Sequence, residues 1–91
     1  MVYLLHFSEP YKHARHYLGY SANVSARLER HSLGHGARLI EVILAAGLSF
    51  ELVRTWDGDR KLERRLHKRG GSRLCPICNP KLINELPRAV R

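Results

Sequence analysis

Two short runs of apolar and aromatic residues lie near the start of the chain. Residues 2–7 form an aliphatic and aromatic run, residues 8–15 are a polar connection, and residues 16–21 form a second short run. Such runs are typical of strands, in which successive side chains point to opposite faces. The two runs are close enough in sequence to form an antiparallel hairpin. That hairpin is expected to place Tyr3 and Tyr17 side by side.

A helical period begins after Asn23. Asn23 is a good N-cap, since its side-chain oxygen can accept a hydrogen bond from a free backbone N–H of the first turn. The helix then presents one stripe with the spacing i, i+3, i+4, i+7, made of Val24, Arg27, Leu28 and His31. Because such a stripe packs against a sheet, Arg27 and His31 are expected to point inward.

Three further elements complete the pattern. Residues 37–46 predict a second helix, which should be the most buried one. Residues 49–56 resemble a third strand with Trp56 on the same face as Phe50. Residues 60–68, which follow a turn signal, predict a third helix. This order predicts a small α+β domain with a three-stranded antiparallel sheet and flanking helices.

Length and charge narrow the class of protein. With 91 residues, the chain is expected to be one domain over residues 1–91, with residues 71–91 as an irregular or short helical tail. Sixteen Lys and Arg against eight Asp and Glu give a net charge of +8, which suits DNA as a partner but also fits a plain basic surface. No stretch matches a membrane span or a signal peptide, so a soluble, cytoplasmic protein without a membrane partner is expected.

The third predicted helix carries much of the positive charge. Its apolar content is essentially Leu62 and Leu66, and Glu63 is the lone acid among its cations. Glu63 lies about 100° from Leu62 around the helix, on the shoulder of the buried stripe. The candidate nucleic-acid contacts are all basic residues, namely Arg60, Lys61, Arg64, Arg65, Lys68, Arg69 and Arg73. Binding through such phosphate contacts should weaken steeply with salt.

An ordered set of residues resembles the GIY-YIG nuclease superfamily over about residues 2–80. The set is Val2-Tyr3-Leu4, Tyr17-Leu18-Gly19, Arg27, His31 and Glu63. The resemblance implies a GIY-YIG-like fold and an endonuclease that hydrolyses a DNA phosphodiester bond with one divalent cation, Mg²⁺ or Mn²⁺. Asn79 is the candidate counterpart of an Asn found late in the family's sequences.

The resemblance also implies a role for each residue. Glu63 would supply the metal's carboxylate, since Mg²⁺ commonly takes one or two carboxylates and completes its octahedron with water and phosphate oxygens. Arg27 would hold the phosphate through its planar donors. Tyr3 and Tyr17 would position and deprotonate the attacking water. His31 would take a proton from a tyrosine or hydrogen-bond it in place.

Each of these residues also has a purely structural interpretation. Tyr3 and Tyr17 could be strand aromatics that pack in the core. Arg27 could be a solvated charge on the helix surface, and Glu63 could form an i, i+4 pair with His67. The alternative function is therefore a non-catalytic nucleic-acid-binding module. A domain this small offers limited recognition surface, so a protein partner or larger complex is a further hypothesis.

Cys75 and Cys78 are the only cysteines and form one CxxC. The motif fits ordinary reduced thiols best, and it also fits half a zinc site or a redox pair. Zinc would require two further ligands, for which His67, His35 or a second chain are the candidates. A zinc-binding interaction domain is therefore another alternative function.

Overall fold

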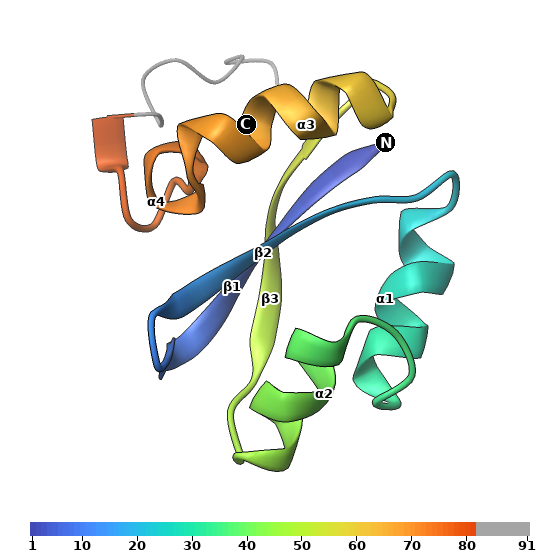
Figure 1. Ribbon diagram of the computed structural model, residues 1–91, viewed down its shortest axis with the longest axis vertical. Coiled ribbons are helices and arrows are strands. Elements are labelled where there is room, and N and C mark those ends of the chain that lie inside the picture. The colour runs from blue at the N-terminus through green and yellow to red at the C-terminus, as the bar shows by residue number, and fades with distance from the viewer. Residues whose placement is uncertain (82–91) are drawn as a thin grey trace.

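The computed structural model describes residues 1–81 and has the predicted α+β fold (Figure 1). Its sheet has three antiparallel strands in the order β2-β1-β3 and is flanked by helices. The elements in chain order are β1 (Val2–Tyr11), β2 (Ala14–Tyr20), α1 (Val24–Ser32), α2 (Arg38–Ala45), β3 (Phe50–Trp56), α3 (Arg60–Arg69) and α4 (Gly71–Leu74). The tail expected over residues 71–91 begins with the short helix α4, and its last ten positions lie outside the described residues.

The β1–β2 hairpin is longer than its hydrophobic pattern indicates. Residues 8–15 do not form a loop, because both strands continue to a two-residue turn at Lys12 and His13, where Lys12 has φ 56°. Tyr11 pairs with Ala14 at the end of the ladder. The polar side chains of this extension stay largely exposed while the backbone extends, so the change from apolar to polar residues does not mark the end of the strand.

A β-bulge in β3 changes which side chains face each layer. Leu4 pairs with Arg54 and Leu5 pairs with Leu52, so Val53 is the extra residue. As a result Trp56 packs with Val53 on the α3 side of the sheet, whereas Phe50 packs on the α1 and α2 side. The prediction that Phe50 and Trp56 share a face is therefore wrong, because strict alternation does not continue through a bulge.

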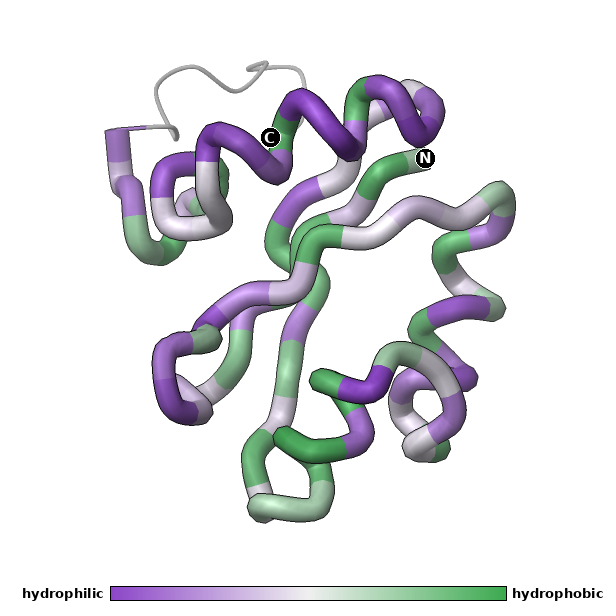
Figure 2. The backbone as a smooth tube through the Cα atoms, viewed as in Figure 1, coloured by the Kyte–Doolittle hydropathy of each residue, from purple (hydrophilic) through white to green (hydrophobic). Residues whose placement is uncertain are grey.

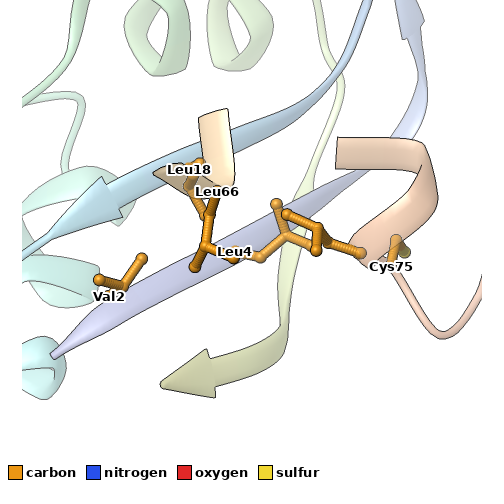
Figure 3. Packing of buried hydrophobic residues seen from close by; sticks show 6 residues of the cluster. Val2, Leu4, Leu18, Leu66 and Cys75 are labelled. Carbon is orange, nitrogen blue, oxygen red and sulfur yellow. The ribbon is translucent and has the colours of Figure 1, made fainter. Parts of the chain in front are cut away.

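The two faces of the sheet bury separate cores. On one face, Tyr3, Leu5 and Phe7 of β1 pack against Ile40 and Ile43 of α2, which confirms α2 as the helix with most buried side chains. The other core is drawn in Figure 3 and comprises Val2, Leu4, Leu18, Leu66, Leu74 and Cys75. Odd and even positions of β1 therefore serve different layers.

The helices that cover the two faces differ in character. Helix α3 is hydrophilic over most of its length (Figure 2), and Leu66 is its buried residue. Among the described residues, none of the helices is long and apolar enough to cross a membrane.

Candidate active site

Helix α1 brings polar groups into the core, as its sequence predicts. The side chain of Asn23 accepts a hydrogen bond from the backbone N–H of Ala26 at 3.1 Å and fixes the start of the helix. His31 is fully buried, and Arg27 is half-buried on the same stripe. Leu28 packs against the same core as Tyr3. The inward orientation of Arg27 and His31 is therefore confirmed.

Three aromatic rings from β1, β2 and α1 meet beneath this helix. The Tyr3 hydroxyl and His31 Nε2 are hydrogen-bonded at 2.8 Å. The Tyr17 ring centroid lies 6.1 Å from that of Tyr3 and 5.6 Å from that of His31. Tyr3 and His31 are fully buried, and Tyr17 is half-buried. The expected proximity of the two tyrosines is confirmed, and Tyr17 forms the more accessible side of the cluster.

Two glycines leave the space that this cluster occupies. A Cβ on Gly19 would lie 2.6 Å from both Cζ and Oη of Tyr3, and a Cβ on Gly36 would lie 2.5 Å from His31 Nδ1. Both distances are shorter than a carbon atom can approach without displacing its neighbour. Gly19 faces Tyr3 directly across the β1–β2 ladder, so the Gly that ends the Tyr17-Leu18-Gly19 motif makes room for the first tyrosine.

Burial keeps the Tyr3–His31 pair neutral near pH 7. It raises the pKa of Tyr3 to about 12, with a further contribution from Tyr17, while the nearby Arg27 guanidinium acts in the opposite direction. The pKa of His31 is lowered by burial, and then by Arg27 and Arg30. A neutral phenol beside a neutral imidazole can donate its O–H to Nε2, with the imidazole proton on Nδ1.

Two buried nitrogens of this cluster have no hydrogen-bond partner within residues 1–81. They are Arg27 Nε and His31 Nδ1. A buried polar atom without a partner is uncommon and calls for an explanation, such as a ligand that supplies the missing contact. Arg27 also lines an open hollow at the start of α1, formed by Ser21, Ala22, Asn23, Ala26, Arg27 and Arg30. Its guanidinium therefore links the buried cluster to an exposed surface that suits an anion.

Glu63 lies on α3, in the layer on the other side of the sheet. Asp59 caps this helix by accepting hydrogen bonds from the backbone N–H groups of Lys61 and Leu62 at 3.0 and 3.2 Å. The Glu63 side chain is 20% exposed and lies 3.9 Å from His67 Nε2. Its position on the shoulder of the buried stripe is confirmed, and so is the i, i+4 proximity to His67.

The structure does not join Glu63 to the aromatic cluster. Among the described residues, no hydrogen bond or ion pair links Glu63 to Tyr3, Tyr17 or Arg27. Glu63 instead lines a second open hollow, formed by Arg60, Glu63, Arg64 and His67. The Arg60 guanidinium lies 5.3 Å from the ring centroid of Tyr20. Tyr20 is followed in the chain by Ser21, which lines the hollow beside Arg27. The two hollows therefore flank the same end of β2.

The predicted nucleic-acid contacts are surface groups. All seven are exposed, namely Arg60, Lys61, Arg64, Arg65, Lys68, Arg69 and Arg73. Arg69 and Arg73 border a third hollow together with Arg54, Trp56, Leu74, Asn79 and Lys81. Arg54 was not among the predicted contacts. It lies 4.7 Å from the Trp56 ring centroid and donates a hydrogen bond to the Leu74 carbonyl at 3.2 Å.

Asn79 belongs to the segment after α4. Its side-chain amide donates a hydrogen bond to the Arg73 carbonyl at 3.0 Å, and its backbone N–H bonds the Cys75 carbonyl. Both contacts fix the turn that carries the CxxC. The structure therefore places Asn79 in the third hollow, away from Tyr3 and His31.

A separate group of potential metal ligands lies where this segment meets the hairpin. The ligand atoms of His6, His16, Cys75 and Cys78 all lie within 4.8 Å of one another. The histidines that lie beside the two cysteines come from the hairpin, and they are not the candidates His67 and His35. The strand register brings the two histidines together, because His6 pairs directly with His16. Nitrogen and sulfur donors of this kind suit zinc and not Mg²⁺ or Mn²⁺.

Comparisons with known proteins give no relative. No family model matches the chain, and neither a curated protein nor a solved structure matches it. The resemblance to the GIY-YIG superfamily therefore stays a prediction that rests on the residues themselves.

Proposed function

We propose that this chain is a GIY-YIG-type endonuclease that hydrolyses DNA phosphodiester bonds with the help of one divalent cation. The observation that carries the proposal is the buried Tyr3–His31 hydrogen bond, set beside Tyr17 and an Arg27 guanidinium with an unpartnered Nε. A hydrophobic core gains nothing from an unpaired buried donor. The arrangement fits a site that positions a phosphate and moves a proton.

The proton chemistry follows from which groups are buried. Tyr17 is half-buried and is the tyrosine that a water molecule reaches first. We assign to it the positioning of the attacking water. A free Tyr3 phenolate is rare near pH 7, because the pKa of Tyr3 is about 12. Tyr3 therefore acts as a relay, which receives a proton at its oxygen while its own proton passes to His31 Nε2.

Arg27 would hold the scissile phosphate. Its guanidinium combines a buried Nε with a position on an open hollow. A phosphate oxygen placed there would satisfy the Nε–H and meet the negative charge that develops during attack. Lys in this position would lose the planar, two-pronged contact.

Glu63 is the residue that would hold Mg²⁺ or Mn²⁺. Its carboxylate is accessible in a hollow lined by cations, where a phosphate is also attracted. One carboxylate fits an ion that keeps several waters and takes its remaining ligands from phosphate. A bound ion would supply charge neutralisation at the scissile phosphate. Without an ion, Glu63 would repel the substrate.

The exposed face of α3 fits a nucleic-acid contact surface. Its cations flank the hollow of Glu63 and continue to the third hollow at Arg73. Phosphate contacts of this kind carry no sequence information directly. We therefore assign to this face the binding of the DNA backbone, with affinity that falls as salt rises.

A plasmid-nicking assay tests the proposal. The protein is mixed with supercoiled, linear duplex and single-stranded DNA in Mg²⁺ or Mn²⁺. We expect cleavage of at least one substrate, loss of cleavage in EDTA and recovery with excess Mg²⁺. E63Q should reduce the cleavage rate by at least about 10²-fold and largely spare DNA binding. E29Q, at an exposed acid on α1, is the matched control and should cleave normally.

A non-catalytic nucleic-acid-binding module is the second candidate. The observation that favours it is the pairing of Glu63 with His67 on a different layer from the tyrosines. Salt-dependent DNA binding without cleavage of any substrate, under either metal, would establish the binding module and exclude the nuclease.

A further inference from the structure

Four soft or borderline ligand groups converge on one side of the β1–β2 hairpin. His6 and His16 face each other directly across the ladder, and the two cysteines come from the segment after α4. Cys75 is fully buried, whereas Cys78 is exposed. The group is independent of the Tyr3 cluster, because even-numbered positions of β1 point away from the face that carries Tyr3.

Four of the six distances between the ligand atoms of this group are close to those around a tetrahedral metal ion. His6 Nδ1 lies 3.2 Å from His16 Nε2, 3.5 Å from Cys75 Sγ and 3.8 Å from Cys78 Sγ, and Cys78 Sγ lies 3.5 Å from His16 Nε2. A tetrahedral Zn²⁺ with its usual bond lengths separates two nitrogens by about 3.3 Å and a nitrogen from a sulfur by about 3.6 Å. These four separations are close to those values, and all the ligand atoms of the group lie within 4.8 Å of one another.

We propose that this chain binds one Zn²⁺ through His6, His16, Cys75 and Cys78, and that the ion is structural. Four protein ligands fill the tetrahedral shell and leave no open position for a substrate. Two thiolates and two imidazoles in this geometry favour zinc over hard cations such as Mg²⁺. The site thus differs in ligand chemistry and in place from the one assigned to Glu63.

The bound zinc joins the end of the described chain to its beginning. Cys75 and His6 are 69 positions apart in sequence, and the segment between them includes α3 and α4. Helix α4 already lies tightly on the hairpin, since a Cβ on Gly71 would approach His16 Cβ at 2.6 Å. Leu74 is the buried residue of α4 in a core cluster of six residues. A small domain of this kind commonly gains its stability from a metal or a disulfide.

The zinc site also bears on the placement of α3. Leu66 of α3 and Leu74 of α4 belong to the same buried cluster as Cys75 (Figure 3). Fixing Cys75 and Cys78 to the hairpin therefore fixes the layer in which α3 packs. We assign to the ion the role of holding this layer on the sheet, with no part in proton transfer.

Metal analysis of the intact chain tests the assignment. Protein purified without added metal should contain one zinc per chain, and a Co²⁺-substituted sample should show the strong visible absorption of tetrahedral cobalt with thiolate ligands. H16A and C78S should each weaken zinc binding by at least about 10²-fold, since even outer-shell changes cost 10- to 100-fold. H13A, at the exposed turn of the same hairpin, should bind zinc as the unchanged chain does.

Several outcomes would overturn the assignment. One is the absence of zinc uptake by the reduced, unchanged chain at equimolar Zn²⁺, and another is a Cys75–Cys78 disulfide in freshly purified protein. Equal zinc binding by H16A, C78S and H13A would overturn it as well. Because the first two results need no variant, the test stands even where a ligand substitution prevents folding.

Failure of the zinc site and failure of the nuclease give different results. E63Q should retain one zinc per chain while it loses cleavage. A chain that binds zinc but cuts no DNA would leave this assignment intact and contradict the proposed function. A chain that cuts DNA in Mg²⁺ without containing zinc would do the reverse.

Discussion

The strand β1 contributes to two histidine clusters of opposite character. On one face Tyr3 meets His31 through a hydrogen bond, beside two buried nitrogens that have no partner within residues 1–81. On the other face His6 meets His16 and two thiols, and the four ligand atoms all lie within 4.8 Å of one another. Unpaired donors suit an anion, whereas converging acceptors suit a cation. Alternation along one strand thus separates a site proposed for chemistry from a site proposed for stability.

The first expected effect tests the anion side of this comparison. R27A should reduce the DNA cleavage rate by about 10²- to 10³-fold, because it removes the buried donor that we assign to the scissile phosphate. R60A, at an exposed cation on α3, should reduce the cleavage rate only a few-fold, mainly because the protein binds DNA more weakly. Single-turnover cleavage rates measure both. Equal losses for the two variants would contradict the phosphate-holding role of Arg27.

The second effect tests the cation side. Zinc at about 100 times its Kd would stabilise the folded chain by about 2.7 kcal/mol, which corresponds to roughly 10–20 °C in Tm for a domain of this size. Calorimetry of the chain with and without zinc should show this shift. C78S should show little or none of it, and E63Q should show all of it. A Tm that is unaffected by zinc would remove the stabilising role of the His–Cys cluster.

Two glycine substitutions disturb the two clusters one at a time, because each adds a methyl group beside only one of them. G19A would place a Cβ 2.6 Å from the Tyr3 ring, and G71A would place one 2.6 Å from His16 Cβ. Each should lower the free energy of unfolding by about 1–3 kcal/mol, the usual cost of overpacking. G19A should also slow cleavage at full zinc content, whereas G71A should weaken zinc binding. Chemical denaturation, zinc analysis and cleavage rates report the three quantities, and identical profiles for both variants would show that the clusters are not separate.

The smallest effect is a pH dependence. The pKa of His31 lies below 6.5 in the folded chain, so below pH 6.5 the unfolded chain binds more protons at this position. The free energy of unfolding should therefore fall as pH drops from about 6.5 towards the folded pKa of His31. The cleavage rate should fall in the same range, because an imidazolium cannot accept the Tyr3 proton. H31Q should flatten the stability profile, as measured by denaturation at a series of pH values at constant zinc occupancy.

Helix α1 and its inward polar groups were predictable from sequence. Asn23 marks the start through a local hydrogen bond, and the spacing of Arg27 and His31 places both on the buried stripe. Local chemistry determines these features, so no knowledge of distant contacts is needed. The same reasoning places Asp59 at the start of α3.

The partners of Cys75 were not predictable in the same way. His6 and His16 become partners of the cysteines only through the hairpin register and the return of α4 to the sheet. The hydrophobic pattern does not give the exact position of the turn, because the polar ends of β1 and β2 are largely exposed. Without that position, the pairing of the two histidines cannot be predicted. The bulge at Val53 likewise depends on pairing with β1, and it reversed the expected side of Trp56.

The most direct test of the proposed function compares cleavage of supercoiled plasmid by zinc-loaded unchanged protein and zinc-loaded Y3F in Mg²⁺. Tyr3 lies in the core, and Y3F removes only the oxygen that bonds His31. We expect the unchanged protein to nick the plasmid and Y3F to do so about 10²- to 10⁴-fold more slowly, the usual contribution of a positioned proton-transfer group. Equal nicking rates for the two proteins, or no nicking by the unchanged protein, would contradict the proposed mechanism.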